Sequence, residues 1–340
     1  MCSSASPSRS RTTNDERRLG RSHRTRRLIK VARVNTRAKT LLFASLLLFG
    51  CGSKAKEPAP AAPTPPPAES APPPAPEPAP PPAPPEPPPP PPPPAYEPSA
   101  DVPQPIRDAV AATDRSDKDR ALDAGRKPGE VLAFFKLAPG QRVGELFAAT
   151  GYTTELMARV VGDSGKVYAQ NTKEIMDRFA RDPLSERLAK PVMKNTVSVE
   201  QPTEKPFPPD AKNLDAVICV LNYHDFVWLK VDRAKMNAAV FAALKPGGVY
   251  GIVDHSAEKG SGLRDGQTIH RIDEDVVKKE ILAAGFKLDA ESEMLHNPSD
   301  PRDWNAAPGA SGEKRGTSDR FTYRFVKPAK GGKAPPKPKK

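Results

Sequence analysis

Cysteine is scarce in this 340-residue chain, which contains only Cys2, Cys51 and Cys219. Three scattered cysteines exclude the disulfide framework that is typical of small secreted domains. Cys219 lies in the apolar run 216–221, where we expect a buried strand residue rather than a reactive thiol. Long apolar runs are also missing. The apolar run at residues 40–50 is too short to cross a bilayer.

Basic charge is abundant in total but missing from the middle of the chain. The net charge is +12, yet residues 1–40 carry twelve Lys and Arg against two acids, and residues 327–340 carry six lysines and no acid. The part between these segments therefore has a net charge of −4. Because a domain of this charge attracts no polyanion, we expect no nucleic-acid partner.

Proline divides the chain, since 27 of the 44 prolines lie between Pro58 and Pro105. A Pro/Ala-rich segment has too little apolar bulk to offset chain entropy and favours an extended tether. We therefore expect a signal region at 1–50, a tether at 51–104, a folded domain at 105–328 and a Lys/Pro-rich tail at 329–340. A folded part of about 225 residues suits one domain with a sizeable core.

Residues 40–50 have the length of a signal-peptide apolar core, with Arg37 and Lys39 as its positive flank. Leu48-Phe49-Gly50-Cys51 resembles the bacterial lipobox, in which the signal is cut before an acylated cysteine. The resemblance implies lipidation of Cys51, a membrane partner and a place in the cell envelope, at the outer membrane or periplasmic face. An ordinary signal peptide or a short membrane anchor is the alternative. Val34 is a candidate start, because the basic region before it is too long for a signal peptide.

The central part of the sequence alternates between short apolar strands and amphipathic helices. We expect strands at 142–147, 166–170, 196–200, 214–221, 249–254, 286–294 and 320–326, and helices at 114–127, 131–135, 153–161, 173–189, 233–244 and 273–285. This alternation predicts an α/β fold with a doubly wound, mostly parallel seven-stranded sheet and helices on both faces. Ligands of such sheets bind at the carboxyl ends of the strands.

Several of these strands, and the turns beside them, resemble motifs of the class I S-adenosylmethionine (SAM)-dependent methyltransferases. Residues 142–154 are similar to the family's first strand and glycine turn, 166–169 to its second strand, and 244–248 to the turn before its fifth strand. Asn222-Tyr223-His224-Asp225, Asp254-His255 and His270-Arg271-Ile272-Asp273 resemble a narrower group of predicted bacterial methyltransferases. The resemblance implies a Rossmann-like fold and SAM as the cofactor.

Residue by residue, the resemblance implies a cofactor site at the first two strand ends. Its members are Glu145, Phe147, Ala149, Gly151, Tyr152, Gln170, Asn171 and Glu200. The family's usual turn, Gly-x-Gly-x-Gly, is here Phe147-Ala148-Ala149-Thr150-Gly151, with one glycine kept. Gln170-Asn171 replaces the acid that usually binds the ribose. Glu200 is either an adenine ligand or a solvated loop residue.

The candidate catalytic residues follow the fourth and fifth strands and are Asn222, Tyr223, His224, Asp225 and His255. His224 titrates near neutral pH, and Asp225 is placed to orient a ring. A packed, hydrogen-bonded histidine is the alternative for His224. The spacing of His224, His255 and His270 matches no metal-binding pattern, so we expect no metal.

Two functions fit these observations. The first is SAM-dependent methyl transfer to a small molecule or an envelope component, with an unknown acceptor. The second is a non-catalytic ligand-binding module of the same fold, tethered to the envelope. Export of the domain and the loss of two glycines favour the second, whereas a purely structural spacer leaves the Asn222–Asp225 motif unexplained. The oligomeric state does not follow from the sequence.

Overall fold

The computed structural model describes residues 96–329, so the predicted signal region, Cys51, most of the tether and the tail beyond Ala329 lie outside the described residues. Within them the chain forms one seven-stranded sheet of order β3-β2-β1-β4-β5-β7-β6. All neighbours pair in parallel except β7, which runs antiparallel to β5 and β6. The predicted mostly parallel seven-stranded α/β sheet is confirmed.

The strand bounds follow the apolar runs of the sequence. They are β1 (Arg142–Glu145), β2 (Lys166–Asn171), β3 (Thr196–Glu200), β4 (Leu214–Val220), β5 (Leu244–His255), β6 (Lys287–Ser292) and β7 (Arg320–Val326). The turn expected at 245–248 lies inside the bounds of β5, and pairing with β4 passes from Leu244 directly to Val249. The turn is therefore an interruption within one strand rather than the boundary of a new one.

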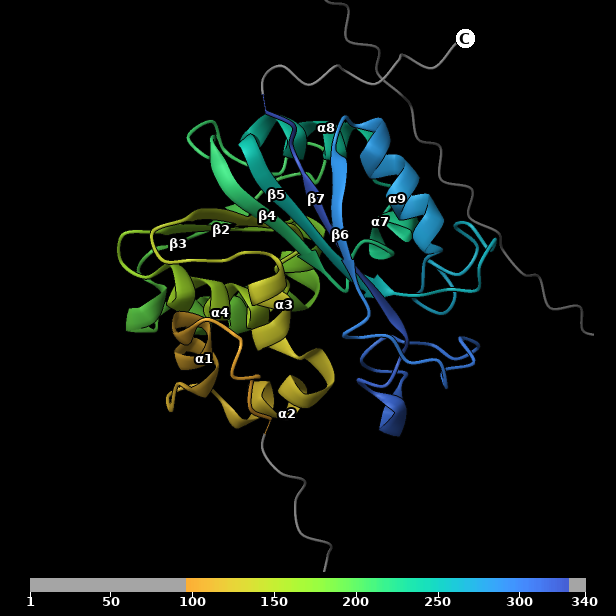
Figure 1. The fold of residues 1–340 in the computed structure, drawn as a ribbon, viewed down its shortest axis with the longest axis horizontal. Helices are drawn as coiled ribbons and strands as arrows, with labels where there is room; N and C mark the ends of the chain where they lie inside the picture. The colour runs from red at the N-terminus through yellow and green to blue at the C-terminus, as the bar shows by residue number, and fades with distance from the viewer. Residues whose placement is uncertain (1–95, 330–340) are drawn as a thin grey trace, which may run out of the picture. The chain divides into compact units, whose positions relative to one another are not determined.

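Helices cover both faces of this sheet (Figure 1). They are α1 (Gln104–Ala111), α2 (Asp117–Arg126), α3 (Pro128–Phe134), α4 (Tyr152–Val161), α5 (Lys173–Ile175), α6 (Arg181–Leu188), α7 (Asp225–Trp228), α8 (Arg233–Ala243) and α9 (Glu274–Ala283), with a π-helix at Met176–Ala180 and 3-10 turns at Pro191–Met193 and Gly312–Lys314. Two helices carry side-chain N-caps, because Ser116 accepts from the Asp119 amide and Asp273 accepts from the Asp275 amide.

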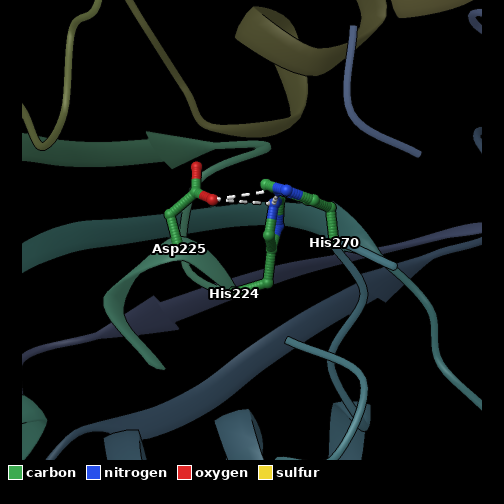
Figure 2. Close-up of side chains that lie close together, drawn as sticks. All are labelled: His224, Asp225 and His270. Atoms are coloured by element: carbon green, nitrogen blue, oxygen red, sulfur yellow. Dashed lines mark hydrogen bonds and ion pairs between the residues drawn. The ribbon is translucent and has the colours of Figure 1, made fainter. Parts of the chain in front are cut away.

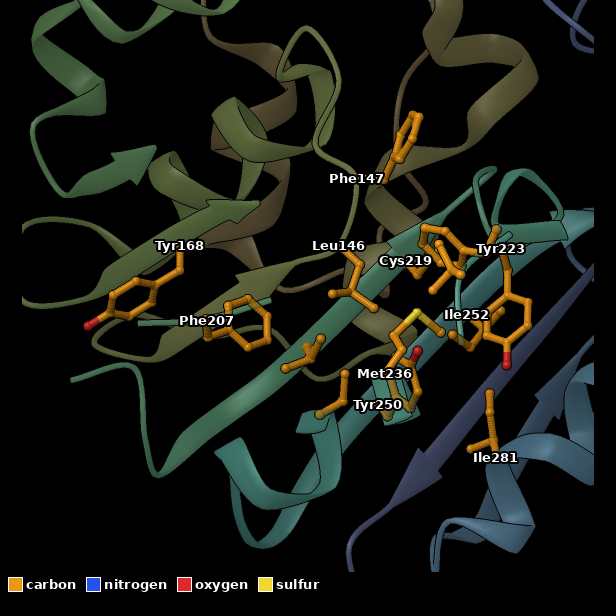
Figure 3. Packing of buried hydrophobic residues seen from close by; sticks show 14 of the residues in the cluster. Leu146, Phe147, Tyr168, Phe207, Cys219, Tyr223, Met236, Tyr250, Ile252 and Ile281 are labelled. Atoms are coloured by element: carbon orange, nitrogen blue, oxygen red, sulfur yellow. The ribbon is translucent and has the colours of Figure 1, made fainter. Parts of the chain in front are cut away.

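Alternate residues of the central strands enter opposite cores. Val217 and Tyr250 pack with residues of α8 and α9, and Cys219 is fully buried among them, as expected (Figure 3). Ala216 and Val249 instead pack with residues of α1, α3 and α4. Because both faces of the sheet are buried, both sets of alternate residues are apolar, and each central strand is a nearly continuous apolar run in the sequence.

The folded domain begins earlier than the sequence suggests. The Tyr96 hydroxyl bonds Glu130 and accepts from the Gly129 amide, and α1 starts within the segment assigned to the tether. Prolines at 103 and 105 hid this helix, although proline suits a first helical turn. Among the helices of residues 96–329, none is long and apolar enough to cross a membrane.

Candidate functional site

The turn from β1 into α4 keeps the backbone of a glycine-rich turn with one glycine. The φ angles are +55° at Phe147, +50° at Ala149 and +86° at Gly151. These are the three glycine positions of Gly-x-Gly-x-Gly. Because a Cβ atom makes this region unfavourable by about 1–2 kcal/mol per residue, something must hold the turn in place. Phe147 and Ala149 thus adopt a conformation that glycine accepts more easily.

Two amides at the end of β2 hold this turn. Asn171 accepts from the Ala149 amide at 2.8 Å and donates to the Ala149 carbonyl at 3.1 Å. Gln170 accepts from the Phe147 amide at 3.1 Å and donates to the Gln201 carbonyl at 2.8 Å. Both side chains are buried. The residues expected at the ribose therefore bind protein backbone in this structure.

Replacing Ala149 with glycine should stabilise the protein, because it relieves the positive φ. The gain, less the flexibility that glycine adds, is expected to be about 0.5–1 kcal/mol in the free energy of unfolding. Ala148 is the control in the same turn, since it has no positive φ; it is buried, whereas Ala149 is partly buried. Ala148→Gly should lose about 1 kcal/mol in urea unfolding. Equal effects of the two variants would contradict the strained-turn interpretation.

Removing the Asn171 amide should release the turn. Asn171→Ala removes the side-chain partner of the partly buried amide and carbonyl of Ala149, so we expect a loss of about 1–2 kcal/mol in urea unfolding. Asn305 is a control with the same kinds of bond, because it accepts from the Ala307 amide at 2.9 Å and donates to the Thr268 carbonyl at 3.2 Å, but it is less buried than Asn171. Asn305→Ala should change stability by less than about 0.5 kcal/mol. A neutral Asn171→Ala would show that the turn stands without this support.

The side chains of the turn point away from its exposed side. The Phe147 ring is buried in the core with its centroid 6.2 Å from that of Phe226. At Gly151 an added Cβ would lie 2.9 Å from Leu184 and from Arg187, so α6 fills the space beside the last glycine. The phenyl group therefore does not lie across the turn, and α6 packs against the turn at Gly151.

The remaining candidates at this end of the sheet have protein partners. The Tyr152 hydroxyl donates to Asp123 of α2 at 2.6 Å. Glu200 is exposed and pairs with Arg181 at 3.1 Å. Tyr152 thus fastens α4 to α2, and Glu200 matches the solvated alternative that the sequence left open.

Glu145 ends β1 with a buried carboxyl group. Burial raises its pKa to about 7, and this rise is opposed in part by the hydrogen bond that Thr154 donates. A carboxylate held at this pKa gains most from a cation placed beside it. Glu145 is therefore a buried acid whose charged form a neighbouring cation would stabilise.

The motif after β4 splits between the core and the strand ends. Asn222 donates to the carbonyls of Phe147 and Val220, so it joins the β4 end to the glycine-like turn. The Tyr223 ring is fully buried, and its hydroxyl donates to Glu280 at 2.9 Å and accepts from Asn237 at 2.8 Å. Tyr223 thus points into the helix layer, away from any position where it would stack on a ligand.

His224, Asp225 and His270 converge at the end of β4 (Figure 2). His224 Nδ1 lies 2.7 Å from Asp254, and its Nε2 lies 3.3 Å from Asp225 and 3.3 Å from His270. Burial opposes a charge on His224, but the carboxylates of Asp254 and Asp225 outweigh burial and raise its pKa to about 10. Burial opposes ionisation of Asp225 too, yet the His224 cation holds the pKa of Asp225 well below its usual range.

His255 differs from its neighbour His224. Burial, followed by repulsion from His224, lowers the pKa of His255 well below its usual value. Its Nδ1 lies 2.6 Å from the Ser318 hydroxyl, and the two histidine rings are 5.6 Å apart. At neutral pH His224 is therefore protonated while His255 is neutral.

One cavity of about 940 Å³ opens at these strand ends. Thr150 from the glycine-like turn, Leu221 after β4 and His255 of β5 line it, together with residues of α2, of α6 and of the 306–320 segment. Its volume falls within the range of about 300–1,000 Å³ typical of small-molecule sites. The carboxyl ends of β1, β4 and β5 thus meet around one ligand-sized space, as the doubly wound sheet predicts.

The sequence missed the residues that the loops bring in. Arg126 and Arg320 line the cavity, and His270 completes the cluster from a loop that returns to β5 through the Ser256–Ile272 bridge. A positive φ of +53° at His270 marks a special backbone position, but no sequence pattern announces it. Only the His270-Arg271-Ile272-Asp273 resemblance pointed to this segment.

The chain matches no protein-family model. It is 28% identical over 165 residues to the ubiquinone/menaquinone biosynthesis C-methyltransferase UbiE of Vibrio parahaemolyticus, covering 46% of this chain and 59% of that protein. It is 32% identical over 112 residues to UbiE of Vibrio campbellii, covering 32% of this chain and 39% of that protein. The chain thus spans about three fifths or less of these curated relatives.

Solved methyltransferase structures resemble the domain at low identity. A SAM-dependent methyltransferase from Aquifex aeolicus matches with a TM-score of 0.44 and 20% identity, covering 62% of this chain and 97% of that one. A putative methyltransferase of Haloferax volcanii, in complex with its activator Trm112, matches with a TM-score of 0.45 and 14% identity, covering 64% and 95%.

Proposed function

We propose that the folded part of this chain binds SAM and transfers its methyl group to a small-molecule or envelope acceptor. The observation that carries this proposal is the positive φ at Phe147, Ala149 and Gly151, which preserves a cofactor-binding turn despite two lost glycines. Such strain persists in proteins mainly where function requires the conformation. The similarity to the two UbiE C-methyltransferases supports the same reaction class.

The residues present fit this cofactor in charge and space. Glu145 would pair with the ammonium group, and the amide backbone near Thr150 would line the approach from the 940 Å³ cavity. Bound SAM supplies an electrophilic methyl group on a sulfonium. The chain's contribution is positioning, which serves an in-line transfer well.

We assign the acceptor's proton to His255 rather than to His224. His255 lines the cavity and stays neutral at pH 7, so it retains a ring nitrogen that can take a proton. His224 is already protonated and is enclosed by Asp254 and Asp225. His224 is therefore not assigned as the general base.

Calorimetry with SAM and with its demethylated product tests the proposal. We expect the purified full-length chain to bind both ligands, and Asn171→Ala to weaken both at least about tenfold, because it frees the turn. Asn305→Ala should bind as the unmodified chain does. No heat at millimolar SAM from a chain that retains its circular dichroism would overturn the proposal.

A second candidate is a non-catalytic module that binds an anion in the same cavity. Within residues 96–329, Arg126 stacks on Tyr152 without an ion-pair partner, and Arg320 donates only to carbonyls of Gly125, Gly316 and Ser318. Burial lowers the pKa of both guanidinium groups, and it is assisted by repulsion from Arg315 at Arg126 and from Arg126 at Arg320. Saturable binding of inorganic phosphate without any binding of SAM would favour this module.

The envelope location remains a proposal that rests on residues 40–51. The lipobox-like segment before Cys51 supports a lipid anchor, and the Pro/Ala-rich segment supports a spacer between membrane and domain. Labelling cells with a radioactive fatty acid should mark the protein, and Cys51→Ser should abolish the label. Persistent labelling of the variant would refute acylation at this cysteine.

A further inference from the structure

We propose that His224, Asp225 and His270 form a binding site for a divalent transition-metal ion of the zinc class. The three groups come from the end of β4 and from the loop before α9, 45 residues further along the chain. One ligand atom of each lies within 4.8 Å of the others. Two imidazoles and one carboxylate are a ligand set that suits zinc and related ions.

The three ligand atoms form a nearly equilateral triangle. Its sides are 3.3 Å from His224 Nε2 to Asp225 Oδ1, 3.3 Å from His224 Nε2 to His270 Nδ1, and 3.2 Å from His270 Nδ1 to Asp225 Oδ1. Zinc bonds of about 2.0–2.1 Å at a tetrahedral angle require sides of about 3.4 Å. The triangle therefore already has the size of one face of a tetrahedral site.

Hydrogen bonding alone leaves one side of the triangle repulsive. Asp225 accepts only, and each imidazole nitrogen either donates or accepts. If both His224 and His270 donate to Asp225, their two protons face each other across 3.3 Å. If one of the two imidazole nitrogens carries no proton, its lone pair faces a lone pair of the Asp225 oxygen. A cation at the centre displaces the imidazole protons to solvent and binds all three atoms at once.

The surrounding residues orient the ligands as they do at metal sites. Asp254 lies 2.7 Å from His224 Nδ1 and accepts from the His224 amide at 2.7 Å, so it fixes the ring and turns Nε2 toward the cluster. A carboxylate behind a ligating histidine is the usual support of a zinc ligand. Trp228 donates to Asp225 Oδ1 at 2.7 Å and holds the carboxylate in the same way.

The backbone of His270 is strained, and its side chain gives solvent access to the cluster. Its φ of +53° is uncommon for a residue with a side chain, and such outliers cluster at functional sites. Its side chain is 28% exposed, against 4% for His224, so an ion can enter from this side. Three protein ligands and a solvent-facing side leave a fourth position for water or a ligand atom, as in catalytic zinc sites.

Metal titration of the full-length chain tests the site without SAM. After treatment with a chelator, the chain is titrated with Zn²⁺ in competition with a chromophoric chelator, and with Mg²⁺ as a comparison. We expect one tight equivalent of Zn²⁺ and no competition by Mg²⁺. Substitution with Co²⁺ should give the intense visible bands of a tetrahedral complex.

Variants locate the bound ion. His270→Ala and Asp225→Asn should each weaken Zn²⁺ binding at least about tenfold. His296→Ala is the matched control, because His296 is a partly exposed histidine that pairs with Asp319 outside the cluster. Undiminished tight binding in both His270→Ala and Asp225→Asn, or no tight equivalent in the unmodified chain, would overturn the proposal. Either result leaves SAM binding, measured separately, unaffected.

Discussion

Arg271→Met should destabilise the folded domain by about 3–5 kcal/mol, because it leaves the Asp300 carboxylate buried without its cation. Arg271 is fully buried, and its guanidinium group binds Asp300 at 2.7 and 3.3 Å. It also donates to the carbonyls of Ser256 and Trp304 at 3.1 Å each, and it stacks over the Trp304 ring. One side chain thus ties the 300–304 loop to the end of β5.

Urea unfolding of the variant measures this loss, with Arg181→Met as the matched control. Arg181 binds two carboxylates, those of Asp177 and Glu200, but it lies at the surface, where such pairs contribute at most about 1 kcal/mol. Adding Asp300→Asn to Arg271→Met should recover part of the stability, because it removes the unpaired charge. A loss no greater than that of Arg181→Met would mean that Asp300 finds other compensation.

The position of Arg271 also bears on the site, because it follows His270 directly in the chain. The Arg271 amide donates to the Asp265 carbonyl at 3.3 Å, and the next residue, Ile272, bonds the β5 end. Fixing Arg271 therefore fixes the loop that presents the His270 ring. We therefore expect a variant that loosens this loop also to displace His270 from the histidine cluster.

The fold was predictable from the sequence because its signals are local and repeated. Apolar strands alternate with amphipathic helices, and the caps at Ser116 and Asp273 and the glycine at 285 mark helix ends. The sequence did not predict the first helix, because Pro103 and Pro105 make its start resemble the proline-rich tether in composition. Its burial depends on contacts with α3 and α4, which no local pattern records.

The site was predictable in place but not in detail. Strand order alone sends Thr150, Leu221 and His255 to one cavity. The direction of each side chain depends on long-range contacts, so Tyr223 turned out to face the core and the β2 amides turned out to hold the turn. The sequence identifies the side chains that can react, whereas long-range packing determines which of them lie close together.

Glu145→Gln should stabilise the protein by about 3 kcal/mol above neutral pH and have little effect in acid. The pKa of Glu145 is about 7 in the folded protein and 4.5 in an exposed glutamate, so the folded state holds the proton more tightly. Between these two values the unfolded chain ionises first, and stability falls as pH rises. Above about pH 7 the full penalty applies, at about 1.4 kcal/mol per pKa unit.

Glutamine carries no charge to bury, so the stability difference between variant and unmodified protein should grow with pH and then level off. Urea unfolding in acid and at about pH 8 measures it, with Glu200→Gln as a surface control. A difference independent of pH would mean that Glu145 titrates normally. If SAM places its ammonium beside this carboxylate, as we propose, saturating SAM should lower the pKa of Glu145. The advantage of the glutamine variant should then reverse, because only the carboxylate gains a cation.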